Sequence, residues 1–201
     1  MVERPYHHGN LRDVLVAEGV KLIEEHGLNA LTLREIGIRA GVSRTAAYRH
    51  FADKAALLSA ISEAAFTEFA TRLEAARESS ERNCAARLEA LGVAYLRFAT
   101  ERKAYYEVMF GLGCEKTQQP TGRSPAGERA FAALRDTILD GQATGEIGPG
   151  DPDIMAGTVW AMSHGVVTLQ AAMGLEQAES RAAFMQAAGK IIYRGMSTNA
   201  G

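Results

Sequence analysis

Capping residues and glycines divide the first 54 residues into short segments, and this pattern predicts that the N-terminal part of the chain is helical. Asn10 is a good N-cap for an amphipathic helix over 11–26, and Gly27 suits its end because glycine adopts the left-handed conformation without a steric penalty. Thr32 opens a second helix over 33–40 with the Thr-x-x-Glu pattern of a capping box.

A tight turn and two further helices follow. Gly41 breaks the second helix, and Ser43 caps a third helix over 44–51. Asp53 caps a fourth helix that covers 54 to about 78. A short turn between two helices needs one residue with positive φ, which glycine supplies. The segment 32–54 therefore predicts a helix-turn-helix.

The remaining residues also have helical periodicity, with breaks rich in turn-forming residues at 111–125 and 144–153. No alternating pattern lasts long enough to indicate a strand. The prediction is an all-α fold of about nine helices, with an N-terminal three-helix head (1–54) and a C-terminal helical body (55–201). The later helices are expected over 82–101, 103–112, 125–143, 152–173 and 176–197.

The third predicted helix has two different faces. Ala47 and Phe51 are four residues apart and are expected to face inward. The opposite face presents guanidinium, hydroxyl, methyl and phenol groups, on Arg44, Thr45, Tyr48 and Arg49. These groups can bind guanine, a thymine methyl and phosphate. A merely solvated face is the alternative, but the turn, the caps and the small contact residues favour a DNA-binding helix.

Positive charge is concentrated in the same segment. The whole chain has a formal net charge of −2, which by itself argues against nucleic acid. Residues 34–54 nevertheless hold five Lys and Arg against two Asp and Glu, whereas residues 55–201 hold 14 against 17. This distribution favours specific binding to an operator over a general affinity for nucleic acid.

The stretch from about 10 to 60 resembles the DNA-binding head of TetR-type regulators. The likeness rests on LTLREIGIRAGVSRTAAYRHFADKAALL, with AGVS at the turn, YRHF closing the recognition helix and DK opening the next helix. YHHGNLR (6–12) and WAMSHG (160–165) resemble a subgroup with a Trp…His-Gly (WHG-type) signature in its ligand-binding half. The resemblance implies a cytoplasmic, ligand-responsive transcription regulator, by default a repressor, that binds double-stranded operator DNA as a homodimer.

The resemblance also implies roles for individual residues. Arg44, Thr45 and Ala46 would face the bases. The residues that would hold phosphates are Thr32, Ser43, Tyr48, His50 and Lys54. Family members often have Lys-Gly where this chain has Arg44-Thr45, so the operator sequence does not follow from the resemblance. The arm at 4–8 either reaches a neighbouring groove or is a disordered tail.

The last two predicted helices are apolar on more than one face, which indicates packing against two things. One face would pack on the chain's own core. The other would pack on a second copy in a two-fold interface, as in TetR-like proteins. The alternative is a thicker core within a monomer. The expected interface residues are Val159, Met162, Val166, Met173, Phe184, Ala188, Ile191 and Ile192. Two recognition helices about 34 Å apart would then meet a palindrome, and an effector could change that spacing through the long fourth helix.

Aromatic residues and methionines cluster in the C-terminal part, as plain core or as the lining of a ligand pocket. His164 lies one turn after Trp160 on an otherwise apolar face, where it is either a hydrogen-bonded core residue or a ligand contact. A mostly apolar lining suits a small hydrophobic or aromatic effector. The residues expected near it are Tyr95, Tyr106, Phe110, Trp160 and His164.

Other classes of protein fit less well. None of the five histidines belongs to a metal-ligand motif, and the G-x-S-x-G, P-loop and H-E-x-x-H patterns are missing, so we expect no enzyme, cofactor or metal. A helical adaptor that binds only protein would leave the polar face of the third helix unexplained. No apolar run approaches the roughly 18 residues of a membrane span. Without a secretory signal, Cys84 and Cys114 are expected to be reduced thiols in the cytoplasm.

Overall fold

The fold is all-α, as predicted. The computed structural model describes residues 11–111, 124–169 and 177–198, and within these ranges it contains nine α-helices, one short 3-10 helix and no strand. Their bounds are α1 (Leu11–His26), η1 (Leu28–Ala30), α2 (Leu33–Arg39), α3 (Arg44–His50), α4 (Lys54–Ser79), α5 (Cys84–Glu101), α6 (Lys103–Met109), α7 (Pro125–Thr144), α8 (Pro152–Thr168) and α9 (Ala178–Met196).

The helix bounds lie close to those expected, and the differences have local causes. Helix α5 begins at Cys84 rather than at 82, because the side chain of Asn83 accepts a hydrogen bond from the Ala86 amide at 2.8 Å and so caps the helix. The 3-10 turn η1 is not among the expected elements. Helix α8 ends at Thr168, and the expected continuation to residue 173 falls largely outside the described residues.

The described chain packs as two compact units. Unit 1 holds residues 11–65 and 103–111, so it contains α1, η1, α2, α3, the first part of α4, and α6. Unit 2 holds the rest of α4 together with α5, α7, α8 and α9. This division concerns packing, and the functional boundary expected between residues 54 and 55 stays a prediction.

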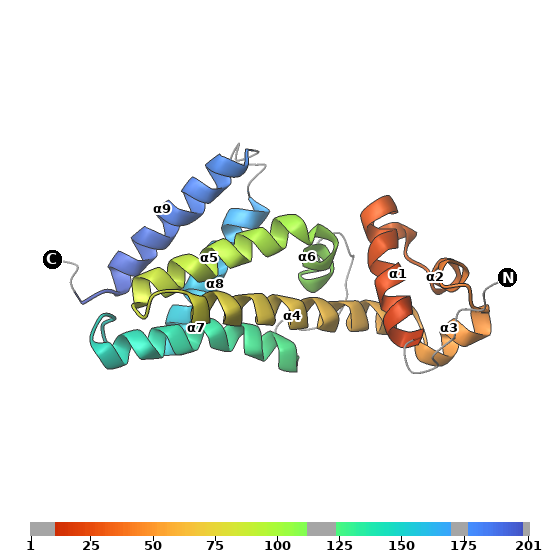
Figure 1. The fold of residues 1–201 in the computed structure, drawn as a ribbon, viewed down its shortest axis with the longest axis horizontal. Helices are drawn as coiled ribbons and strands as arrows, with labels where there is room; N and C mark the ends of the chain where they lie inside the picture. Colours follow the sequence, from red (N-terminus) through yellow and green to blue (C-terminus); the bar gives the residue numbers. More distant parts are fainter. Residues whose placement is uncertain (1–10, 112–123, 170–176, 199–201) are drawn as a thin grey trace. The chain divides into compact units, whose positions relative to one another are not determined.

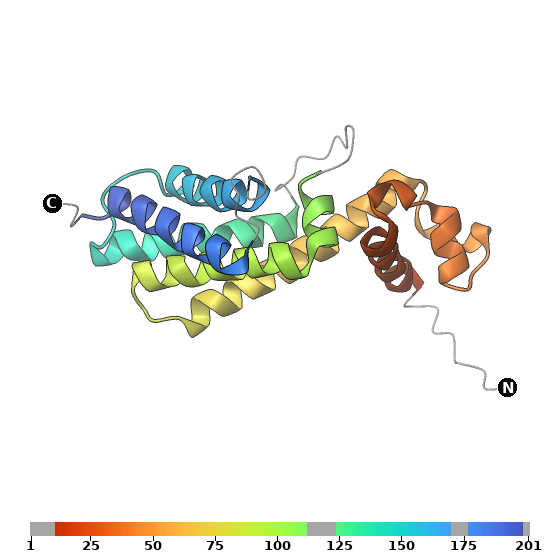
Figure 2. The same cartoon turned by 90° about the horizontal axis from the view of Figure 1, so that it is seen from above.

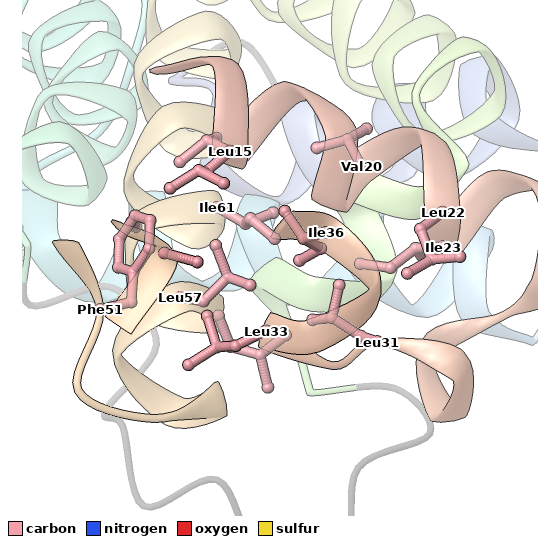
Figure 3. Packing of buried hydrophobic residues seen from close by; sticks show 14 of the residues in the cluster. Leu15, Val20, Leu22, Ile23, Leu31, Leu33, Ile36, Phe51, Leu57 and Ile61 are labelled. Carbon is pink, nitrogen blue, oxygen red and sulfur yellow. The ribbon is translucent and has the colours of Figure 1, made fainter. Parts of the chain in front are cut away.

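Unit 1 is built around an aliphatic core. Leu15 of α1, Leu31 after η1, Ile36 of α2, and Leu57 and Ile61 of α4 are fully buried together (Figure 3). Helix α6 contributes Ala104 to the same cluster, although it follows unit 2 residues in the chain. This core fixes α2 and α3 against α1 and the start of α4.

Unit 2 is built around aromatic rings. Phe69 on α4 lies 5.2 Å from Tyr95, 4.9 Å from Phe98 and 5.8 Å from Trp160, measured between ring centroids. Helix α9 lies on α5 and α8 (Figures 1 and 2). Among the described residues α9 fully buries only Met185, and Ile191 on the same helix is 71% exposed.

Candidate nucleic-acid interface

Two caps and one glycine set the geometry of the helix-turn-helix. The Thr32 hydroxyl accepts a hydrogen bond from the Glu35 amide, and the Ser43 hydroxyl accepts one from the Ala46 amide, both at 3.2 Å. Between the two helices Gly41 has a φ of 68°, in the left-handed region that favours glycine. The predicted turn and both predicted caps are therefore present.

Helix α3 packs on α2 through very small residues. A Cβ built at Gly37 would lie only 3.6 Å from the Cβ of Ala47, and Ala47 is completely buried. Phe51 at the C-cap is also buried. The inward face is therefore the one expected, and it leaves the opposite face of α3 toward solvent.

The outward face of α3 is exposed and polar. Arg44, Thr45, Tyr48, Arg49 and His50 are all exposed. The guanidinium carbon of Arg44 lies 5.3 Å from the centroid of the Tyr48 ring, within the range of a cation–π contact. This stack holds the two largest side chains of the face side by side.

The arginines of α3 keep their charge available. Within the described part of the chain, neither Arg44 nor Arg49 forms an ion pair with a carboxylate. Arg39 on α2 is different, because its guanidinium is 2.7 Å from Glu25 and 3.8 Å from Glu35. Both arginines of α3 thus keep their charge, whereas that of Arg39 is paired.

The remaining residues expected to contact DNA flank α3. Thr32 is exposed at the start of α2, Ala46 is half-buried in the first turn of α3, and Lys54 begins α4. The Lys54 ammonium donates to the backbone carbonyl of Leu28 at 3.2 Å, which leaves two of its three N–H groups for other acceptors.

Arg12 adds a cation that the sequence interpretation did not select. It is exposed at the start of α1, and its guanidinium carbon lies 5.4 Å from the centroid of the Phe51 ring. Phe51 is the C-cap of α3. The sequence did contain a signal for Arg12. It is a basic residue at the second position of the first helix, close to the N-terminal arm at 4–8.

Three of the residues expected near an effector are brought together in unit 2. Tyr95 and Trp160 lie 6.0 Å apart with rings almost perpendicular, and the Tyr95 hydroxyl is 3.3 Å from Nδ1 of His164. Burial lowers the pKa of His164, because the charged imidazolium would lose its hydration there. Tyr95 is buried, whereas Trp160 and His164 are half-buried.

The other two expected effector residues lie in unit 1. Tyr106 and Phe110 contact each other, with ring centroids 4.8 Å apart, and Tyr106 is buried. Their role in effector binding stays a prediction.

The residues expected at a dimer interface are placed in several environments. Val159 and Val166 are buried within the chain, whereas Ile191 is 71% exposed. Met162, Phe184, Ala188 and Ile192 are half-buried. Met173 lies outside the described residues. The exposed and half-buried members on α9 are the ones that a second copy could still cover.

A cavity of about 870 Å³ lies between α5, α8 and α9 in unit 2. Its lining includes Val159, Met162 and Ile192 from the expected interface set, but none of the five residues expected to bind an effector. Sequence periodicity marks these positions as apolar and cannot show that the helices stand apart. The described residues contain no cluster of three potential metal-ligating side chains, and no helix among them is long and apolar enough to cross a membrane.

Comparison with known families agrees with this geometry. Residues 15–61 match the family described as bacterial regulatory proteins, tetR family, and residues 88–189 match the family described as tetracyclin repressor-like, C-terminal domain. The first match contains the whole helix-turn-helix, and the second covers most of unit 2.

Individual relatives extend this result. The tetracycline repressor protein class G of Vibrio anguillarum is 39% identical over 61 residues, which span 30% of this chain and 29% of that relative. A solved structure of a protein of unknown function from Rhodococcus sp. RHA1 is 35% identical, with a TM-score of 0.83, over 98% of this chain and 100% of that one. A solved SmeT–triclosan complex shares the fold at 22% identity, with a TM-score of 0.68, over 94% of this chain and 92% of that one. The chain belongs to the TetR family of transcriptional regulators.

Proposed function

We propose that this protein is a TetR-type repressor that binds a palindromic operator as a homodimer and is released by a small hydrophobic effector. The outward face of α3 is the observation that supports the proposal most directly. Arg44 and Arg49 are exposed there without a carboxylate partner in the described chain, on a helix fixed by a cap at one end and buried Phe51 at the other. A guanidinium so placed suits base edges or phosphates.

The start of α3 is proposed to read the bases. In helix-turn-helix proteins the recognition helix contacts base edges through its N-terminal residues, which here are Arg44, Thr45 and Ala46. An arginine can bind O6 and N7 of guanine together, while the small Thr and Ala side chains permit close approach. The operator thus should contain a guanine opposite Arg44 in each half-site.

The residues around α3 are proposed to hold the phosphates. Ser43 and Thr32 are exposed at helix N-termini, where amide groups also point outward. Tyr48, Arg49 and His50 extend the polar face toward the end of α3, and Lys54 adds its unused N–H groups. Such contacts fix the protein on the duplex and do not discriminate between bases.

Helices α8 and α9 are proposed to form the dimer interface. The support is the uncovered apolar surface of α9, with Ile191 71% exposed and Phe184 and Ala188 half-buried on the same helix. An isologous contact through this surface would supply the second recognition helix that a palindromic operator requires.

An effector is proposed to bind in unit 2 and to act through α4. This helix is continuous from Lys54 to Ser79 and belongs to unit 1 up to Ala65 and to unit 2 beyond it. A ligand that reorients the second part of α4 would therefore also move the recognition helix that the first part supports. The triclosan complex of SmeT supports the expectation of an apolar or aromatic effector.

Two narrower assignments accompany the proposal. The Trp160 to Gly165 stretch, in which His164 bonds to Tyr95, supports membership of the WHG-type subgroup. The family supports a cytoplasmic regulator without enzymatic activity.

Operator binding tests the proposal. Sequences bound by the protein would be selected from DNA around its own gene and then titrated by fluorescence anisotropy. Arg44→Ala and Tyr48→Ala should each weaken operator binding by about 1–3 kcal/mol, as expected for a specific contact. Arg129→Ala, which removes an exposed arginine of unit 2, is the matched control and should bind normally. Normal binding by both α3 variants would show that α3 is not the recognition helix.

A further inference from the structure

The cavity between α5, α8 and α9 has the lining of a ligand site. Its volume of about 870 Å³ lies within the range of small-molecule pockets. Apolar side chains from all three helices line it, including Leu88, Val93, Leu96, Met162, Met185 and Ile192. In the neighbouring aromatic cluster Phe69, Phe98 and Tyr95 are at most 2% exposed, and none of them lines this cavity.

The cavity is elongated along α9. The α9 residues that line it extend from Ala178 to Arg194, about 24 Å at the rise of an α-helix. Helix α5 lies antiparallel to α9, since Glu89 bonds to Gln186 at 2.7 Å and a Cβ at Gly92 would lie 3.6 Å from Met185. In Figure 1 the two helices converge near the start of α5 and diverge toward the start of α9.

Positive charge outweighs negative charge around this cavity. Four Lys and Arg residues line it against Glu89, which is bonded to Gln186, and Glu179. The antiparallel register places Arg97 of α5 at the same end as Arg181 and Glu179 of α9, so two guanidinium groups stand against one carboxylate there. Two guanidinium groups from opposite walls suit a carboxylate or a similar anion.

We propose that this cavity binds an elongated apolar molecule with one anionic group, and that the anion lies at the Arg97 and Arg181 end. The apolar stretch between α5 and α9 would cover the tail of the ligand. Because α5 and α8 carry the cavity on one side and Tyr95, Trp160 and His164 on the other, the ligand would contact the helices that hold the aromatic cluster. Its effect on DNA rests on the proposed function, but its binding does not.

Glycine 189 provides a way to fill the cavity. It lines the cavity one turn after buried Met185, and a Cβ built there would have no atom within 4 Å. Gly189→Leu should therefore place a side chain in the cavity and also favour the helix. Gly195→Leu is the matched control, because Gly195 is on the same helix, has equal space, and lies one turn after exposed Ile191 outside the cavity lining.

The test uses the full chain and equilibrium dialysis with labelled palmitate, compared with labelled hexadecanol as the uncharged analogue. Palmitate should bind one molecule per chain, more tightly than hexadecanol. Gly189→Leu should weaken palmitate binding at least tenfold, while Gly195→Leu should not. Arg97→Met should weaken palmitate about tenfold and leave hexadecanol unchanged. Arg194→Met, the same change at the other end, should retain palmitate binding.

Several results would overturn the proposal. It fails if neither probe binds, if Gly189→Leu binds palmitate normally, or if Arg194→Met and not Arg97→Met loses palmitate. If neither probe binds, sedimentation of Gly189→Leu would identify the occupant of the cavity. Conversion of a dimer to a monomer would show that a second copy fills it. Palmitate that binds at this site but does not release the operator would support the site and count against effector release in the proposed function.

Discussion

The two units use the same residue, arginine, in different ways. In unit 2 Arg72 bonds to Glu68 and Glu101, both at 2.7 Å, and Arg129 bonds to Glu74. On α3 of unit 1, Arg44 and Arg49 are exposed and form no ion pair within the described chain. Surface ion pairs contribute little to stability, but they neutralise charge that a polyanion could otherwise attract. The two arginines of α3 therefore keep a charge that a polyanion can attract, whereas Arg72 and Arg129 do not.

Arg39 shows how local this difference is. It lies in unit 1, five residues before Arg44, yet it pairs with Glu25, and that hydrogen bond lowers the pKa of the Glu25 carboxyl. The charge of Arg39 is thus neutralised, whereas the charges of Arg44 and Arg49 on α3 are not. The net charge of −2 for the whole chain conceals this contrast.

The cores of the units differ as well, and this predicts the largest effect on stability. Phe69 is completely buried and contacts three rings of the unit 2 cluster. Phe69→Ala should lower the free energy of unfolding by about 3–5 kcal/mol, because it leaves a cavity among rigid rings. Urea denaturation followed by the fluorescence of Trp160, the single tryptophan, measures it.

Leu139→Ala is the control for the core prediction. Leu139 is 43% exposed on α7 of the same unit, so its truncation should change the free energy of unfolding by less than about 0.5 kcal/mol. Equal losses in the two variants would mean that the aromatic cluster contributes no more than the surface.

Local sequence patterns predicted the helices and the helix-turn-helix well, because their causes are local. Thr32, Gly41 and Ser43 act through their own backbone conformation and hydrogen bonds to residues three positions away. The edges of a buried face are less predictable, because Val14 is apolar and lies one residue before fully buried Leu15, yet it is 38% exposed. The helical repeat of 3.6 residues predicts which residues form the apolar face. The segments that pack against this face decide which residues at its margin are buried.

Sites made by distant segments could not be predicted in this way. The Tyr95–His164 contact joins residues 69 positions apart, and no local pattern pairs them. The cavity beside them depends on the distance between α5 and α9, which no residue pattern encodes. Tyr106 and Phe110 were grouped with Trp160 on composition alone, and their place at an effector site stays a prediction.

The contrast between free and paired arginines predicts a difference in salt dependence. Arg49→Gln should weaken binding to all DNA sequences alike and reduce the slope of log affinity against log salt by about 1, because one phosphate contact is lost. Arg72→Gln, which removes a paired arginine of unit 2, should leave the slope unchanged. Anisotropy titrations at several salt concentrations decide between these outcomes, and equal slopes for all three proteins would remove the proposed role of Arg49.

Loss of a helix cap should cause a smaller loss of stability, and its effect on DNA binding should differ between the two units. Ser43→Ala should destabilise the protein by about 1 kcal/mol, as should Asp151→Ala at the N-cap of α8. Only the first should also weaken operator binding, since α3 is the proposed recognition helix. Ser43→Asp adds a test, because it keeps a cap but brings a negative charge to the proposed phosphate site. It should retain stability and lose operator binding, and a variant that lost neither would place Ser43 outside the interface.

The smallest predicted effect concerns pH and His164. Burial lowers the pKa of His164 from its ordinary value of 6.5, whereas the unfolded chain keeps that value. Below pH 6.5 the unfolded state therefore binds more protons, so the free energy of unfolding should fall until the pH passes the folded pKa. His164→Asn removes this titration, and its urea denaturation should depend less on pH than that of the wild type between pH 7.5 and 5. Tyr95→Phe loses the hydroxyl but keeps the ring that buries His164, so it should lower stability at every pH while retaining the wild-type pH dependence. If Tyr95→Phe abolished that dependence, the hydrogen bond rather than burial would control the imidazole.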